Sequence, residues 1–284
     1  YIFYINFSSR IPQKFMCNSK MKLKVYFVHA SQLKEREKVI NEFQRQLTRY
    51  KFKNIGSVKV ETITEYDPNA IPSDFIQKNI NYSPFKEPES MTVYNSFLKN
   101  MHLFQLSSVL KHYKALEHIA NSPEDELSIV FEDDIVYEEK ICLMLDRLFN
   151  HLPSEYDMIF LGLPGNKEIK NRNAVQFQVT SEVFKMLPYN DAYLITRAAA
   201  KKLYDEFLPI KFVGNIQFSY LMEKLNFKTL ICQPNIVIDG SKLGMYLSTL
   251  NPNNILMFNN DYMKVRSLLL KESDLTKEEE VQIE

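Results

Sequence analysis

The feature that most constrains the fold is a repeated alternation of short apolar runs with longer segments of helical periodicity. The chain begins this pattern with an apolar run at 22–30, a segment at 31–50 whose apolar residues recur every three or four positions, and an alternating run at 58–63. The spacing predicts a strand, a helix with Ser31 as its N-cap, and a second strand. Such a unit is expected to form a right-handed crossover between two parallel strands.

The same alternation continues along the rest of the chain. Further strands are expected at 127–131, 156–162, 175–179, 183–187, 192–195 and 227–232, and further helices at 102–120, 138–152, 197–207 and 216–225. The segment 64–88, which carries four prolines, is predicted to be a long loop that is mobile without donor and helps to close the site. The whole pattern predicts an α/β fold with a Rossmann-like, mostly parallel central sheet, flanking helices and a small hairpin formed by 175–179 and 183–187.

The expected domain organisation follows from the composition of the two ends. Residues 21–255 are expected to form one domain, and 256–284 a helical tail. Met21 begins a run that is typical of a natural protein start, so 1–20 is interpreted as an extension or arm. No signal peptide is visible and no run reaches about 18 uncharged apolar residues, so no transmembrane segment is predicted and a cytoplasmic location is favoured.

Composition excludes several classes of function. Lysine plus arginine and aspartate plus glutamate both number 35, so there is no basic excess for binding nucleic-acid phosphates. Only six glycines occur, and none of them forms a dinucleotide fingerprint or a P-loop. The five histidines and three cysteines show no zinc-binding spacing. No nucleic-acid partner is therefore expected, and a homodimer is left open.

Three consecutive acids, Glu132, Asp133 and Asp134, directly follow the strand expected at 127–131. Ligands of open α/β sheets bind beyond the carboxyl ends of strands. Mg²⁺ or Mn²⁺ accepts one or two protein carboxylates there and keeps positions for diphosphate oxygens. Alternation along a strand directs Glu132 and Asp134 to one face and Asp133 to the other. The alternative is that the acids cap the next helix and interact with its dipole.

Several segments, in a fixed order, are similar to those of a known family. They are 24–28 (KVYFV), 112–117 (HYKALE), 132–134 (EDD), 152–153 with 156–162 (YDMIFLG), and 191–203 (DAYLITRAAAKKL). In order and spacing they resemble glycosyltransferase family 25, the lipopolysaccharide-biosynthesis and procollagen galactosyltransferases, over roughly residues 21–250. The resemblance implies a GT-A fold and a metal-dependent, inverting transfer of a hexose, galactose or glucose, from a UDP-sugar to a hydroxyl.

The resemblance also implies roles for the acidic motif. Glu132 and Asp134 would bind the metal, Mn²⁺ or Mg²⁺, and Asp133 and Asp134 would contact the donor. The implied acceptor is a glycoprotein, a collagen-like hydroxylysine or another glycan. The family's Pro-Val-Asp element corresponds here to 212–215 (FVGN), which lacks the acid. This favours, as an alternative, a catalytically weakened domain that binds nucleotide-sugar or a protein partner. A third possibility is a metal-dependent nucleotidyltransferase, which also uses strand-end carboxylates.

Residues near other strand ends complete the candidate site. His29 ends the first strand, where a nucleobase or ribose is expected to lie, with a structural role as the alternative. His112, Asp191 and Asp239 are candidate catalytic bases. The alternatives are a buried helix histidine for His112 and a turn acid that caps a helix for Asp191.

Overall fold

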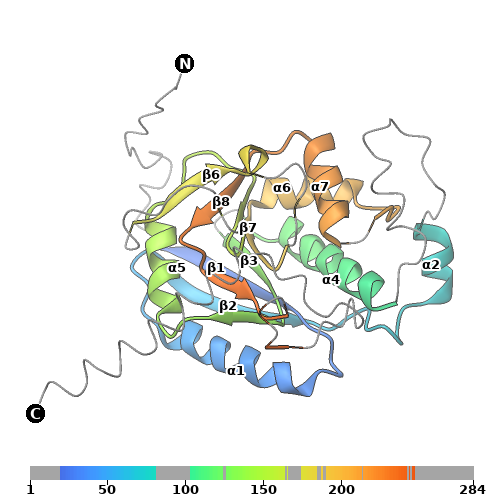
Figure 1. Ribbon diagram of the computed structural model, residues 1–284, viewed down its shortest axis with the longest axis horizontal. Coiled ribbons are helices and arrows are strands. Elements are labelled where there is room, and N and C mark those ends of the chain that lie inside the picture. Colours follow the sequence, from blue (N-terminus) through green and yellow to red (C-terminus); the bar gives the residue numbers. More distant parts are fainter. Residues whose placement is uncertain are drawn as a thin grey trace, which may run out of the picture.

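The centre of the molecule is a seven-stranded sheet (Figure 1). The structure, a computed structural model, describes residues 20–80, 103–123, 126–163, 165, 174–183, 187, 190–212, 214–241, 243 and 245–246. In spatial order its strands are β2 (Ile55–Ile63), β1 (Met21–Val28), β3 (Glu126–Glu132), β7 (Ala192–Ile195), β5 (Met158–Phe160), β8 (Thr229–Gln233) and β6 (Gln176–Val179). A separate two-stranded sheet pairs β4 (Ile135–Tyr137) with β9 (Val237–Asp239).

The strand directions confirm the predicted α/β fold with a mostly parallel sheet. Strands β1, β2, β3, β5 and β8 run in one direction, and β7 and β6 run against them. The predicted parallel pairing of the first two strands is confirmed, with Lys22 beside Ser57 and Val28 beside Ile63. The carboxyl ends of the five parallel strands therefore lie along one edge of the sheet, where ligands of such folds bind.

Helices cover both faces of the sheet, so that two hydrophobic cores form (Figure 1). One face packs against α4 (Leu103–Ala120), α6 (Arg197–Glu206) and α7 (Gly214–Lys224), and the other against α1 (Lys34–Arg49) and α5 (Ile141–Asn150). The apolar stripe of α1, Ile40, Phe43 and Leu47, is buried, as its helical spacing predicts. None of the described helices has the length and apolar character needed to cross a bilayer.

The structure changes two of the expectations. Ser31 does not cap α1, whose N-cap is Leu33, because both its amide and its hydroxyl donate to Asp67. The expected loop 64–88 contains a short helix, α2 (Ser73–Asn79), and its residues from 81 lie outside the described ranges. Strand β6 pairs with β8 and a small sheet joins β4 to β9, while the expected hairpin partner at 183–187 lies mostly outside the described ranges.

Several other expectations fall on residues beyond the described ranges. They are the arm at 1–19, the central part of the expected strand 183–187, and the C-terminal tail at 256–284.

The start of α6 supplies a test of this local structure. The hydroxyl of Thr196 accepts a hydrogen bond from the amide of Ala199 at 3.2 Å and so caps the helix. We expect Thr196→Ala to lower the free energy of unfolding by about 1 kcal/mol. This corresponds to a fall in Tm of about 2–4 °C. The control is Thr48→Ala, since Thr48 bonds only to carbonyls of its own helix and its loss is expected to leave Tm nearly unchanged.

Candidate functional site

The predicted site residues meet at the carboxyl edge of the sheet. Strand β3 ends at Glu132, and β1, its parallel neighbour, ends next to His29. Strand β7 is antiparallel to β3, so its first residues, rather than its last, lie at this edge. The carbonyl of Asp191, just before β7, accepts a 2.7 Å hydrogen bond from the amide of Glu132. The small sheet brings Asp239, at the end of β9, beside Ile135 and hence beside the acidic motif.

Asp133 is held by a buried ion pair with α1. Its Oδ1 accepts from Nη1 of Arg36 at 2.5 Å, and its Oδ2 interacts with Nδ1 of His29 at 2.9 Å and accepts from the amide of Ala30 at 3.1 Å. Burial alone would raise the pKa of Asp133, but the hydrogen bond from His29 and the charge of Arg36 outweigh it and lower the pKa. Asp133 is therefore a charged structural anchor between β1, β3 and α1.

Glu132 points to the opposite side, toward α4, as strand alternation predicts. Its Oε1 lies 2.9 Å from Nε2 of His112, a ring with no exposed surface, and Nδ1 of that ring lies 3.0 Å from the hydroxyl of Tyr193. Burial raises the pKa of Tyr193 well above its ordinary value, so the phenol keeps its proton. In the neutral imidazole, Tyr193 then donates to Nδ1 and Nε2–H donates to Glu132. This chain fixes one carboxylate oxygen of Glu132.

Asp134 lies in a different environment, because β3 ends at Glu132 and strand alternation no longer applies. Its Oδ2 accepts from the hydroxyl of Ser241 and lies 3.9 Å from Nη1 of Arg36, while its buried Oδ1 has no hydrogen-bond partner among the described residues. Burial, followed by the charges of Asp239 and Glu132, raises the pKa of Asp134 to about 8. A carboxylate here is poorly satisfied by the protein alone.

Gly240 allows the chain that carries Asp239 to approach Asp134 closely. The amide of Gly240 donates to the carbonyl of Asp134 at 2.7 Å. A Cβ at this position would lie 2.6 Å from the same carbonyl oxygen and 2.6 Å from the ring of Tyr246. Glycine is therefore required for this close approach of the two carboxylate-bearing segments.

The structure contradicts the helix-capping interpretation of the three acids. Strand β4 follows them, and α5 begins only at Ile141, with Lys140 as N-cap and no side-chain cap. The acids are instead bound by side chains from α1, α4 and the segment after β9.

The chemistry of the donor set fits a divalent cation in part. Across the ranges that the structure describes, no three His, Cys, Asp or Glu side chains come together as a preformed metal site. Mg²⁺ and Mn²⁺, however, need only one or two protein carboxylates when substrate phosphates supply further oxygens. Asp134 and Asp239 provide such a pair, and a cation would supply the partner that the buried Oδ1 of Asp134 lacks among the described residues.

Sequence reasoning missed two buried cations at this edge. Arg36 lies at helical spacing with the apolar residues Ile40 and Phe43. A charged residue on the expected buried face of α1 could therefore have indicated a buried ion pair. Lys111 is 1% exposed; its Nζ donates to the carbonyl of His29 at 2.5 Å and to the carboxylate of Asp67. Lys111 thereby connects the segment after β2, which carries Asp67, to α4 and to the end of β1.

Comparison with known proteins gives only distant likenesses. No known protein family and no curated protein matches the chain in sequence. Similar solved structures include 4-diphosphocytidyl-2C-methyl-D-erythritol synthase from Anaerococcus prevotii, with 12% identity, 79% of this chain and 93% of that chain covered, and a TM-score of 0.36. Another is mouse xyloside xylosyltransferase 1 in its apo form, with 13% identity, 74% and 78% covered, and a TM-score of 0.29. At such TM-scores neither likeness decides the function.

The environment of Asp134 predicts that this acid destabilises the metal-free protein. Because its pKa is raised in the folded state, stability should fall as pH rises from about 4 to about 8. Asp134→Asn keeps an acceptor for Ser241 and removes the charge. In EDTA at pH 7.5 we expect it to raise the free energy of unfolding by about 1–3 kcal/mol, the range for a poorly satisfied buried polar group. The control is the exposed Asp74→Asn, and an unchanged or lower Tm for Asp134→Asn would contradict this account.

The ion pair of Arg36 gives the opposite prediction. Arg36→Met leaves the buried carboxylates of Asp133 and Asp134 without their cation, so we expect a loss of about 3–5 kcal/mol in urea unfolding. Adding Asp133→Asn should recover part of the loss. The control is Arg45→Met, which breaks an exposed pair with Glu42 and is expected to leave the unfolding curve nearly unchanged. Equal effects of Arg36→Met and Arg45→Met would show that the buried pair has no special role.

Proposed function

We propose that the chain is a metal-dependent glycosyltransferase that moves a hexose from a UDP-sugar to a hydroxyl acceptor, as the resemblance to family 25 implies. The observation that supports this proposal most strongly is the state of Asp134. Its carboxylate is buried at the ligand-binding edge of the sheet, lacks a partner at Oδ1 and lies near the second carboxylate of Asp239. Such a pair is expected to attract a divalent cation, Mn²⁺ or Mg²⁺.

In this proposal the three adjacent acids, Glu132, Asp133 and Asp134, have different roles. Asp134 and Asp239 hold the cation, which when bound neutralises the charge of a departing diphosphate. Asp133, engaged by Arg36 and His29, keeps the motif at the end of β1, where the nucleoside would bind. Glu132 contributes less to the metal than the sequence suggests, because His112 already occupies one of its oxygens.

The proton acceptor is proposed among the carboxylates rather than the histidines. His112 has no exposed surface, so it orients Glu132 instead of meeting a substrate. The side chain of Glu132 is 17% exposed and has its Oε1 fixed by His112, which suits it to orient an acceptor hydroxyl. Asp191 remains a second candidate base, because its backbone is hydrogen-bonded to Glu132 at the same edge.

Calorimetric titration with UDP tests the proposal directly. We expect UDP to bind in the presence of Mn²⁺ and to bind at least about tenfold more weakly in excess EDTA, because the attraction between the phosphates and the metal would be lost. Asp134→Ala should remove the Mn²⁺ dependence, and Asp74→Ala, which changes an exposed acid, should retain it. UDP binding that is indifferent to EDTA would contradict the metal role of Asp134.

A panel of UDP-sugars, assayed for UDP release with and without Mn²⁺, distinguishes the alternatives. Mn²⁺-dependent release supports the transferase, and Asp134→Ala should abolish it. Tight UDP binding without turnover of any sugar would favour the weakened binding domain. Pyrophosphate release from a nucleoside triphosphate would favour a nucleotidyltransferase.

A further inference from the structure

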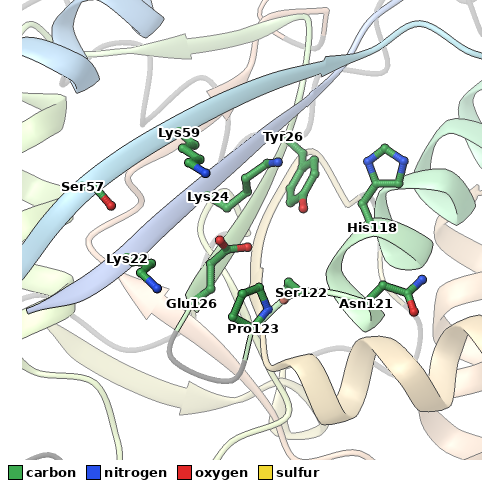
Figure 2. A pocket seen from close by; sticks show the side chains of 10 residues that line it. All are labelled: Lys22, Lys24, Tyr26, Ser57, Lys59, His118, Asn121, Ser122, Pro123 and Glu126. Carbon is green, nitrogen blue, oxygen red and sulfur yellow. The ribbon is translucent and has the colours of Figure 1, made fainter. Parts of the chain in front are cut away.

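A polar hollow of 430 Å³ lies on the sheet at the end opposite to the acidic motif (Figure 2). Its floor is formed by the first residues of β1 and by β2, which carry Lys22, Lys24 and Lys59. Its wall is formed by the end of α4 and the turn that follows, with His118, Asn121 and Ser122, and Glu126 of β3 lies beside Lys22 on the floor. The hollow has the size of a small-molecule site.

The hollow exists because α4 ends before it reaches the first residues of β1. Farther along the strands, Tyr26 and Val28 pack under α4 in the hydrophobic core. The helix ends at Ala120, so Lys22 and Lys24, earlier on the same face of β1, are not buried beneath it. The chain places lysines, rather than apolar residues, on the part of the face that the helix leaves open.

The strand register places like charges side by side on this floor. Lys24 of β1 lies directly beside Lys59 of β2, an arrangement that is unfavourable without a compensating anion. Lys24 is paired with Glu61 at 2.6 Å, and Glu61 also accepts from His118 at 2.6 Å. Lys59 forms no ion pair with any carboxylate that the structure describes, so its charge is left for a ligand.

A second feature of the same row is an unsatisfied hydroxyl. Ser128 of β3 lies beside Lys24 on the side away from Lys59. Its side chain is 1% exposed, and its Oγ has no hydrogen-bond partner among the described residues. Ser128 does not itself line the hollow, so the charge of Lys59 is what a ligand there would meet first.

We propose that this hollow binds a phosphate group, with Lys59, Lys24 and Lys22 as its cationic contacts and Ser57, Asn121 and Ser122 as hydrogen-bond donors. Lysine ammonium groups bind phosphate as point charges, and hydroxyl and amide groups complete its shell. Glu126 limits the affinity, because it places one negative charge directly beside Lys22 in the same hollow.

The site is separate from the proposed transferase site. Lys22 and Val28, which lies beside Glu132, are six residues apart on β1. At about 3.3 Å per residue the two ends are about 20 Å apart. A ligand in the hollow is thus an anchor or an effector and not the donor substrate, and this proposal does not depend on the proposed function.

Titration of the full chain with inorganic phosphate at constant ionic strength, followed by Tm and by calorimetry, tests the proposal. Saturable stabilisation is expected for the unmodified chain. Lys59→Met should weaken binding by about three- to tenfold, the effect of one partly exposed charge contact. Glu126→Gln should tighten it by a similar factor, because a repelling charge is removed. The matched control is Lys38→Met, an exposed lysine on α1 that should leave the affinity unchanged.

Lys59→Met and Glu126→Gln are expected to change the phosphate affinity in opposite directions. Such opposite effects distinguish a binding site from general screening of surface charges by the added anion. No saturable response, equal weakening by Lys38→Met and Lys59→Met, or failure of Glu126→Gln to tighten binding would each overturn the proposal. Co-sedimentation with phosphatidylcholine vesicles that contain phosphatidic acid then identifies the source of the phosphate. Vesicle binding that Lys59→Met weakens and Lys38→Met does not assigns a lipid headgroup, and a response to free phosphate alone assigns a soluble ligand.

Discussion

The buried ion pair between Arg36 and Asp133 organises the candidate site. It joins α1, on one face of the sheet, to the end of β3, and through His29 and Ala30 it also fixes the end of β1. A buried pair of this kind adds little net stability, but it is costly to break, so its geometry is well defined. Burial lowers the pKa of Arg36, yet the charges of Asp133 and Asp134 outweigh it and keep the guanidinium charged. Arg36 thus offsets part of the negative charge of the acidic motif.

That single cation explains why three adjacent acids differ so much. Asp133 receives the direct contact, Asp134 lies 3.9 Å away, and Glu132 turns to His112 on the other face. One acid is bound by a cation and one by the His112 ring, while Asp134 lies near Asp239 and has its pKa raised to about 8. Differences between neighbouring carboxylates of this kind are common at functional sites.

The sequence predicts the fold well and the contacts of the site only in part. Periodicity locates most of the described helices and strands, and strand alternation correctly separates Glu132 from Asp133. It does not anticipate that β3 ends at Glu132, which frees Asp134 to meet a segment more than a hundred residues away. It also misses Arg36 and Lys111, because a cation on a buried helix face is recognised only when its carboxylate partner is known. A contact between two segments that are far apart in the sequence leaves no local pattern from which it could be predicted.

Topology, more than any single motif, concentrates charge at this edge. In a sheet with all its strands parallel, the segment before β7 would lie at the opposite edge, about the length of a strand away from Glu132. Because β7 is antiparallel to β3 and β5, Asp191 instead lies at the carboxyl edge, where its carbonyl binds the amide of Glu132. The pairing of β4 with β9 adds Asp239 from a third segment. The same sheet leaves lysines at its other end, since α4 does not extend over the first residues of β1. One sheet thus carries the carboxylates of Asp134 and Asp239 beyond one end and the lysines Lys22, Lys24 and Lys59 toward the other.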